Sequence, residues 1–177
     1  MKALFLLIPL LMANGCKTQP TEVSATQNTS IGAATNKPSG CPEEGNCTVK
    51  IHQQKTLNIQ KDDSGAYYPQ MVAGETTVVE YTYLKKGPEG TADGDYSETI
   101  FFEIPAGNQN LSKTDAALQQ VKLLYGKHCF CREAGYYPVT EGTLSVVKNA
   151  AELKFNLSFK VKETSQVVTH ISEIVKP

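Results

Sequence analysis

The amino-acid sequence predicts a mainly β domain, an antiparallel β-sandwich or a Greek-key barrel with at most one short helix. Short runs rich in β-branched and aromatic residues, such as 76–84 and 96–104, are separated by turn-forming residues. Residues 153–161 alternate strictly between apolar and polar side chains, which is typical of a strand with one buried and one solvated face. We therefore expect residues 47–177 to form a single β domain.

The first half of this domain contains alternating or β-branched runs separated by loop chemistry. Pro105 ends the last of these runs, because proline cannot donate to a strand ladder. The expected strands of this half are 47–52, 55–60, 76–84 and 96–105, with a turn at 62–65 and an exposed loop at 85–95.

Two segments of the second half carry signals for both helix and strand. Residues 111–126 begin with Ser112 and Asp115 in a capping pattern, and we expect a short helix near 113–119 followed by a strand over 121–131. Residues 165–175 keep apolar residues at helical spacing, but their β-branched content favours a strand. The remaining expected strands are 142–148 and 152–162.

Residues 1–15 have the pattern of a secretory signal peptide. Lys2 precedes an apolar run from Ala3 to Met12, and small residues follow at Ala13 and Gly15. The apolar run is about ten residues, roughly half of what a membrane-spanning helix needs. Ordinary cleavage after Gly15 would leave a mature chain that begins with a free cysteine.

The stretch LLMANGC, which ends at Cys16, resembles the lipobox of bacterial lipoproteins. The resemblance covers residues 1–16 only, and it departs from the usual pattern at Ala13, where leucine is typical. It implies that Cys16 is acylated and becomes the first residue of the mature chain. Lys17, in place of an aspartate, implies the outer membrane of the cell envelope. Two or more acyl chains hold a protein stably, since each buried methylene contributes about 0.8 kcal/mol.

Residues 16–46 are expected to be the lipidated N-terminus and a disordered tether, because they contain few apolar residues. Such a tether has a reach of ~25–30 Å. Without residues 1–15 the chain keeps 16 basic and 18 acidic side chains, and Arg132 is its single arginine. A nucleic-acid-binding protein would have a basic surplus, so we expect no nucleic-acid partner.

Four cysteines remain after Cys16: Cys41, Cys47, Cys129 and Cys131. An even number of cysteines in an exported chain predicts two disulfides. On a strand, Cys129 and Cys131 would point to the same face, and a bond between them would require a kinked backbone. We therefore expect each of them to pair with one of Cys41 and Cys47, although the direct bond stays open.

A metal site is the alternative interpretation of the His-Cys-x-Cys segment. His128, Cys129 and Cys131 are ligand types that suit Cu(I) or zinc, so a periplasmic metal-binding protein is the second hypothesis for function. Strand geometry weakens this hypothesis, because His128 would face away from the two cysteines.

Two Tyr-Tyr-Pro runs are the remaining candidates for a binding surface. Tyr67 and Tyr68 begin one run, and Tyr136 and Tyr137 begin the other. These four side chains would form an aromatic binding platform if the two runs lay together, since tyrosine offers a large contact area at low entropic cost. The alternative is that one tyrosine of each pair packs inward and the other covers a sheet edge.

The sequence contains no pattern typical of a catalytic site or a cofactor-binding loop. His52, His128 and His170 stand in separate segments without a patterned nucleophile or carboxylate. We therefore expect no cofactor and no enzyme activity. The expected function is that of an envelope-anchored binding or assembly module, held to the membrane by its lipid, with an envelope protein or a small ligand as partner.

Overall fold

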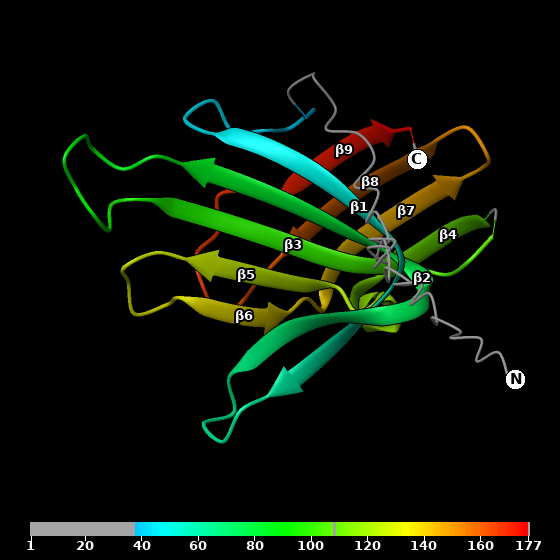
Figure 1. Ribbon diagram of the computed structural model, residues 1–177, viewed down its shortest axis with the longest axis horizontal. Coiled ribbons are helices and arrows are strands. Elements are labelled where there is room, and N and C mark those ends of the chain that lie inside the picture. The colour runs from blue at the N-terminus through cyan, green and yellow to red at the C-terminus, as the bar shows by residue number, and fades with distance from the viewer. Residues whose placement is uncertain (1–37, 108, 177) are drawn as a thin grey trace, which may run out of the picture.

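The computed structural model describes residues 38–107 and 109–176 (Figure 1). The expected signal peptide, Cys16 and the tether up to residue 37 lie outside the described residues. In chain order the elements are β1 (Asn46–Lys61), β2 (Tyr67–Lys85), β3 (Tyr96–Ile104), β4 (Gln109–Thr114), the 3-10 helix η1 (Asp115–Val121), β5 (Leu124–His128), β6 (Gly135–Pro138), β7 (Glu141–Lys148), β8 (Leu153–Lys160) and β9 (His170–Val175).

The strands form two antiparallel sheets, which confirms the predicted mainly β, sandwich-like fold with one short helix. The first sheet has the order β1-β2-β3-β5-β6, and the second has the order β4-β7-β8-β9. Figure 1 shows the first sheet in front of β7, β8 and β9. Among the described residues, no helix is long and apolar enough to cross a membrane.

The main core lies between the two sheets and follows from the alternation of β8. Leu153, Phe155, Leu157 and Phe159 are buried, whereas Lys154 and the other intervening side chains of β8 are at least partly solvated. Rings from opposite sheets meet in the core: the Phe102 and Phe155 centroids are 5.3 Å apart, and those of Tyr125 and Phe159 are 6.1 Å apart. Burial of these apolar side chains is the main stabilising contribution to the fold.

The β1–β2 hairpin continues past the main core as an arm, residues 55–73. A bulge separates the arm from the rest of β1, where Gln54 has a φ of 54° and the register shifts. On the outer face of the first sheet the arm covers a second apolar cluster that includes Leu57, Phe101 and Leu124. In the view of Figure 1 the arm runs beneath β6.

The segment between β4 and β6 differs in detail from expectation. The helix spans Asp115–Val121, and it ends at Lys122, which has a left-handed φ of 52°. The following strand ends at His128, three residues earlier than expected, because the chain bends at residues 129–131. The strand favoured for residues 165–175 is confirmed over His170–Val175, which is β9, whereas residues 165–169 belong to the connection between β8 and β9.

Two residues of the expected tether, Ser39 and Cys41, contact the folded domain. Ser39 forms an antiparallel bridge with Ser172 on β9, and the Ser172 amide donates to the Ser39 carbonyl over 3.2 Å. Cys41 is disulfide-bonded to Cys47 at the start of β1. The chain is therefore attached to both sheets before β1 begins.

Candidate functional site

A row of inward-facing side chains crosses the first sheet at one end of the sandwich. Tyr83 pairs with Cys47 on one side and Glu98 on the other, and Glu98 pairs with Lys127. Glu98 has an exposed fraction of 0% and Lys127 one of 5%. Buried charges need hydrogen-bonding partners, and both side chains find them on the connection between β8 and β9.

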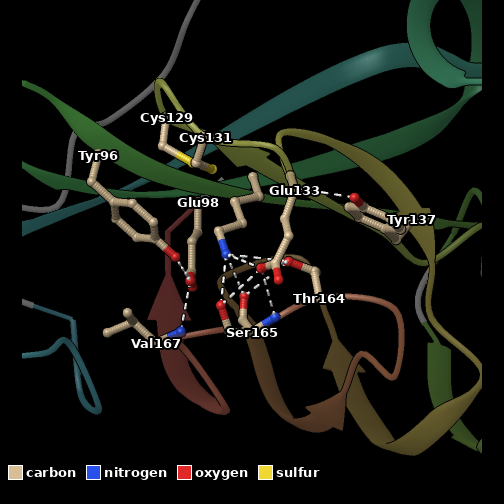
Figure 2. A network of polar contacts seen from close by, with 10 residues as sticks. Tyr96, Glu98, Cys129, Cys131, Glu133, Tyr137, Thr164, Ser165 and Val167 are labelled. Atoms are coloured by element: carbon tan, nitrogen blue, oxygen red, sulfur yellow. Dashed lines mark hydrogen bonds and ion pairs between the residues drawn. A yellow bond between two sulfur atoms is a disulfide. The ribbon is translucent and has the colours of Figure 1, made fainter. Parts of the chain in front are cut away.

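Glu98 accepts hydrogen bonds from three donors. The amides of Val167 and Val168 donate to its carboxylate over 2.6 and 2.8 Å, and the hydroxyl of Tyr96 donates to the same group. Figure 2 shows Glu98 between Tyr96 and the backbone of Val167. The carboxylate therefore joins the first sheet to the β8–β9 connection through backbone groups.

Lys127 on β5 is the second connection between the first sheet and the same segment. Its Nζ lies 2.8 Å from the Glu133 carboxylate, 2.7 Å from the Ser165 hydroxyl and 3.2 Å from the Thr164 hydroxyl. We name Tyr96, Glu98, Lys127, Glu133, Thr164 and Ser165 the polar network (Figure 2).

Hydrogen bonds stabilise the ionised form of Glu133. Those from Lys127, Thr164 and Ser165 lower its pKa from 4.5 to about 2, so the carboxylate stays ionised well below its ordinary titration range. The ionised carboxylate holds the Lys127 ammonium in place as a hydrogen-bond donor. The Ser165 hydroxyl accepts from Lys127 Nζ over 2.7 Å and donates to the Glu133 carboxylate over 3.1 Å.

Burial keeps the phenols around the network protonated. Desolvation raises the pKa of Tyr96 and Tyr125, and the Glu98 carboxylate raises both further. Tyr96 therefore remains a neutral donor to Glu98. The Lys127 Nζ also lies 5.9 Å from the centroid of the Tyr96 ring, within reach of a cation–π interaction.

A cavity of about 400 Å³ opens beside the polar network. We name it the lysine cavity, because three lysines and no carboxylate occur among the described residues that line it. Its walls come from the end of β2, the β2–β3 loop, β3, β5 and the β8–β9 connection. The lining residues are Lys85, Lys86, Gly87, Pro88, Gly94, Tyr96, Lys127, Ser165, Gln166 and Val167.

The two outer lysines of the cavity have solvated partners. Lys86 lies 2.7 Å from Asp95, and Lys85 pairs with Glu44. The exposed fractions of the Lys85 and Lys86 side chains are 47% and 71%. These ion pairs therefore contribute little to the stability of the fold, and another anion can replace the carboxylates. Pro88, Val167 and the Tyr96 ring add apolar surface to the lining. The cavity can therefore hold an anion that carries an apolar group.

Glu98 and Lys127 were missed by the sequence analysis, although a signal for both exists. Glu98, Ile100 and Phe102 occupy every second position of YSETIFFEI, so Glu98 points to the same inner face as the two apolar residues. Lys127 occupies the same face of β5 as Tyr125. A charged residue at an inward strand position indicates a buried polar site, because an unpaired charge there would be costly.

The expected disulfide connectivity is wrong. Cys41 pairs with Cys47, and Cys129 pairs with Cys131. Strands β2 and β3 separate Cys47 from β5, which corresponds to roughly 14 Å at ~4.8 Å per strand. A disulfide needs Cα atoms within about 7 Å. The direct bond forms because the chain bends after His128, so Cys129 and Cys131 lie on a loop instead of a strand.

The metal-binding alternative has no preformed site in the described part of the chain. No group of three or more His, Cys, Asp or Glu side chains suited to a metal ion occurs there. The sulfurs of Cys129 and Cys131 are bonded to each other, and His128 packs against Tyr136 with ring centroids 5.2 Å apart. Metal binding through these residues would require the reduced pair.

The two Tyr-Tyr-Pro runs lie side by side, but their four rings do not share one face. Tyr67 pairs with Tyr136 across β2 and β6. Tyr136 packs on the second cluster, whereas Tyr137 packs on the main core, with its ring 6.5 Å from that of Tyr125. Tyr68 is 41% exposed, and its hydroxyl donates to Gln60. Tyr67 and Tyr136 are thus brought together, and Tyr137 lies on the opposite side.

Comparison of the chain with protein-family models, with curated proteins and with solved structures finds no match. The chemistry of the site is therefore the basis for a functional assignment.

Proposed function

We propose that this protein is a lipid-anchored, non-enzymatic binding module of the bacterial cell envelope, and that it binds a small anion carrying an apolar group in the lysine cavity. The observation that carries the proposal is the charge of the lining: Lys85, Lys86 and Lys127 contribute three ammonium groups, and the described lining residues include no carboxylate. A volume of about 400 Å³ is within the usual size range of small-molecule sites.

The three lysines have different roles in this proposal. Lys127 is 5% exposed and its protons are donated to Glu133, Thr164 and Ser165, so it supplies a fixed positive charge at the inner end of the cavity. Lys85 and Lys86 are solvated. When the ligand binds, its anion replaces Glu44 and Asp95 as the ion-pair partner of these lysines. A charge fixed in a partly desolvated wall attracts an anion more strongly than one in open water.

The apolar part of the ligand contacts the remaining lining. The ring of Tyr96 and the side chains of Pro88 and Val167 offer apolar surface, and Val167 is 47% exposed. A ligand with a carboxylate on an aromatic or aliphatic group would contact both the lysines and the apolar part of the lining.

Binding is tested with three probes of similar shape and different charge: benzoate, benzamide and benzylamine. The protein is the mature chain with Cys16→Ser, which lacks the lipid acceptor, and binding is measured by saturation-transfer NMR. We expect benzoate to bind, benzamide to bind more weakly and benzylamine not to bind. Equal binding of all three probes, or of none, would contradict the proposal.

A pair of double variants identifies the lysines that matter. Lys85→Ala/Lys86→Ala is expected to weaken benzoate binding about tenfold, which corresponds to ~1.4 kcal/mol. Lys154→Ala/Lys160→Ala removes two exposed lysines from the outer face of β8 and serves as the matched control. The control is expected to bind benzoate as the parent does, since the total charge changes by the same amount in both variants.

The anchor is tested separately by intact mass of the protein extracted from membranes. We expect cleavage before Cys16 and a mass increase that corresponds to acyl chains. Cys16→Ser is expected to move the protein from the membrane to the soluble fraction. An unacylated wild-type chain in the soluble fraction would remove the anchor from the proposal and leave the ligand site as it is.

A further inference from the structure

We propose that Cys129–Cys131 is an exchange-active disulfide that oxidises a thiol pair in a basic segment of a partner protein. This inference goes beyond the lysine cavity and does not depend on it. It is based on the loop that carries the two cysteines, residues 129–134, which we name the Cys129 loop.

The disulfide is accessible from solvent. Cys131 is exposed, Cys129 is half-buried, and Phe130 between them has an exposed fraction of 90%. In contrast, Cys41 and Cys47 both pack partly against the main core. Exposed disulfides are the ones that take part in exchange, because a thiolate must approach one sulfur along the bond.

The Cys129 loop keeps its shape through other interactions. The Ala134 amide donates to the Cys131 carbonyl, and the Tyr137 hydroxyl donates to the Glu133 carbonyl over 3.0 Å. Glu133 is also held by Lys127. Because β5 and β6 are paired up to the base of the loop, the disulfide adds little to the structure of this turn. A chemical role accounts for its presence better than a structural one.

A depression beside the disulfide indicates the kind of partner. It has a volume of about 300 Å³ and is lined by two aspartates together with Cys129 and Phe130; the lining residues are Asp93, Asp95, Ser97, His128, Cys129 and Phe130. Asp95 is paired with Lys86, so Asp93 is the carboxylate that, next to the exposed Phe130 ring, favours a segment with basic and apolar side chains. We therefore assign a cysteine-containing basic peptide as the substrate class.

The exchange step balances within the two thiol pairs. A substrate thiolate attacks Sγ of Cys131, the disulfide bond breaks, and Cys129 leaves as a thiolate that takes up a proton. The second substrate thiolate then attacks the substrate sulfur of the mixed disulfide, and Cys131 leaves and is protonated. The substrate loses two electrons and two protons, and the cysteine pair gains them. Arg132 directly follows Cys131, and positive charge beside a cysteine favours its thiolate.

The experiment uses the oxidised mature chain with Cys16→Ser and a synthetic peptide with two cysteines flanked by arginines. Protein thiols are alkylated at intervals and assigned by mass spectrometry. We expect one equivalent of peptide to be oxidised, with thiols on Cys129 and Cys131 while Cys41–Cys47 stays intact. Simultaneous opening of both disulfides, or opening of Cys41–Cys47 first, would overturn the proposal.

Matched variants separate chemistry from structure. Cys41→Ser/Cys47→Ser is expected to keep the exchange, and Cys129→Ser/Cys131→Ser to lose it while unfolding at the same urea concentration as the parent. Phe130→Ala and Asp93→Asn are each expected to slow exchange with the arginine peptide several-fold, and a glutamate-flanked peptide is expected to react slowly with every variant. A large loss of stability in Cys129→Ser/Cys131→Ser would show that this disulfide is structural and would overturn the proposal.

Discussion

Glu98 and Lys127 are direct cross-strand neighbours on the inner face of the first sheet, and both bind the same segment of the opposite sheet. Glu98 accepts from the amides of Val167 and Val168, and Lys127 donates to the side chain and carbonyl of Ser165. Two buried side chains of opposite charge thus fix the β8–β9 connection, which forms one wall of the lysine cavity.

Replacement of Glu98 is expected to destabilise the fold. Glu98→Ala leaves the amides of Val167 and Val168 and the Tyr96 hydroxyl without their acceptor, and we expect a loss of about 3 kcal/mol in the free energy of unfolding. Glu98→Gln keeps one acceptor oxygen and is expected to lose about 1–2 kcal/mol. Urea unfolding followed by circular dichroism measures both. An unchanged free energy of unfolding in Glu98→Ala would mean that the carboxylate does not hold the β8–β9 connection.

The stability of the network is expected to depend on pH through Glu133. Its pKa is lowered from 4.5 to about 2 in the folded state by hydrogen bonds from Lys127, Thr164 and Ser165. A lowered pKa in the folded state means that the contribution of this carboxylate is present above pH 4.5 and is lost as the pH falls towards 2. Glu133→Gln is expected to flatten the decrease of the melting temperature in this window. Parallel curves for the variant and the parent would contradict the role of Glu133.

The Cys41–Cys47 disulfide is expected to contribute to stability. It closes a loop next to the start of β1, where Cys41 and Cys47 pack partly on the main core. Chain-entropy arguments give about 2 kcal/mol for a loop of this size. Cys41→Ser/Cys47→Ser is therefore expected to unfold at lower urea concentration than the parent. An unchanged midpoint would show that the N-terminal attachment adds nothing to the fold.

The arm is expected to open independently of the main core. Leu57 is fully buried in the second cluster, and Leu57→Ala is expected to speed amide hydrogen exchange over Lys55–Lys61 while β8 stays protected. Leu157→Ala removes the same atoms from the main core and is the matched control. The control is expected to lower global stability by about 3 kcal/mol. Equal acceleration across the domain in Leu57→Ala would mean that arm and core unfold as one unit.

The sequence predicted most of the fold, because the hydrophobic pattern of strands such as β8 is local. The alternation of Leu153, Phe155 and Leu157 was sufficient to place one buried face. The β-branched content of residues 165–175 also indicated β9, although the strand begins only at His170.

The polar network and the disulfide pairing depend on long-range contacts that a local pattern does not contain. Val167 and Val168 lie 69 and 70 positions from their acceptor Glu98. The Cys129–Cys131 bond depends on where β5 ends, and the expected strand ran three residues too far. Register between strands and the exact end of a strand are both set by tertiary packing.

The ligand site is tested most directly by a benzoate titration of the ¹⁵N-labelled mature chain with Cys16→Ser, followed by two-dimensional amide NMR. We predict that the shifts concentrate on the described lining of the lysine cavity, at Lys85–Gly87, Gly94, Tyr96, Lys127 and Ser165–Val167, and that the arm is unaffected. Shifts that instead concentrate on the face of Tyr67 and Tyr136, or an unchanged spectrum at millimolar benzoate, would contradict the proposed ligand site.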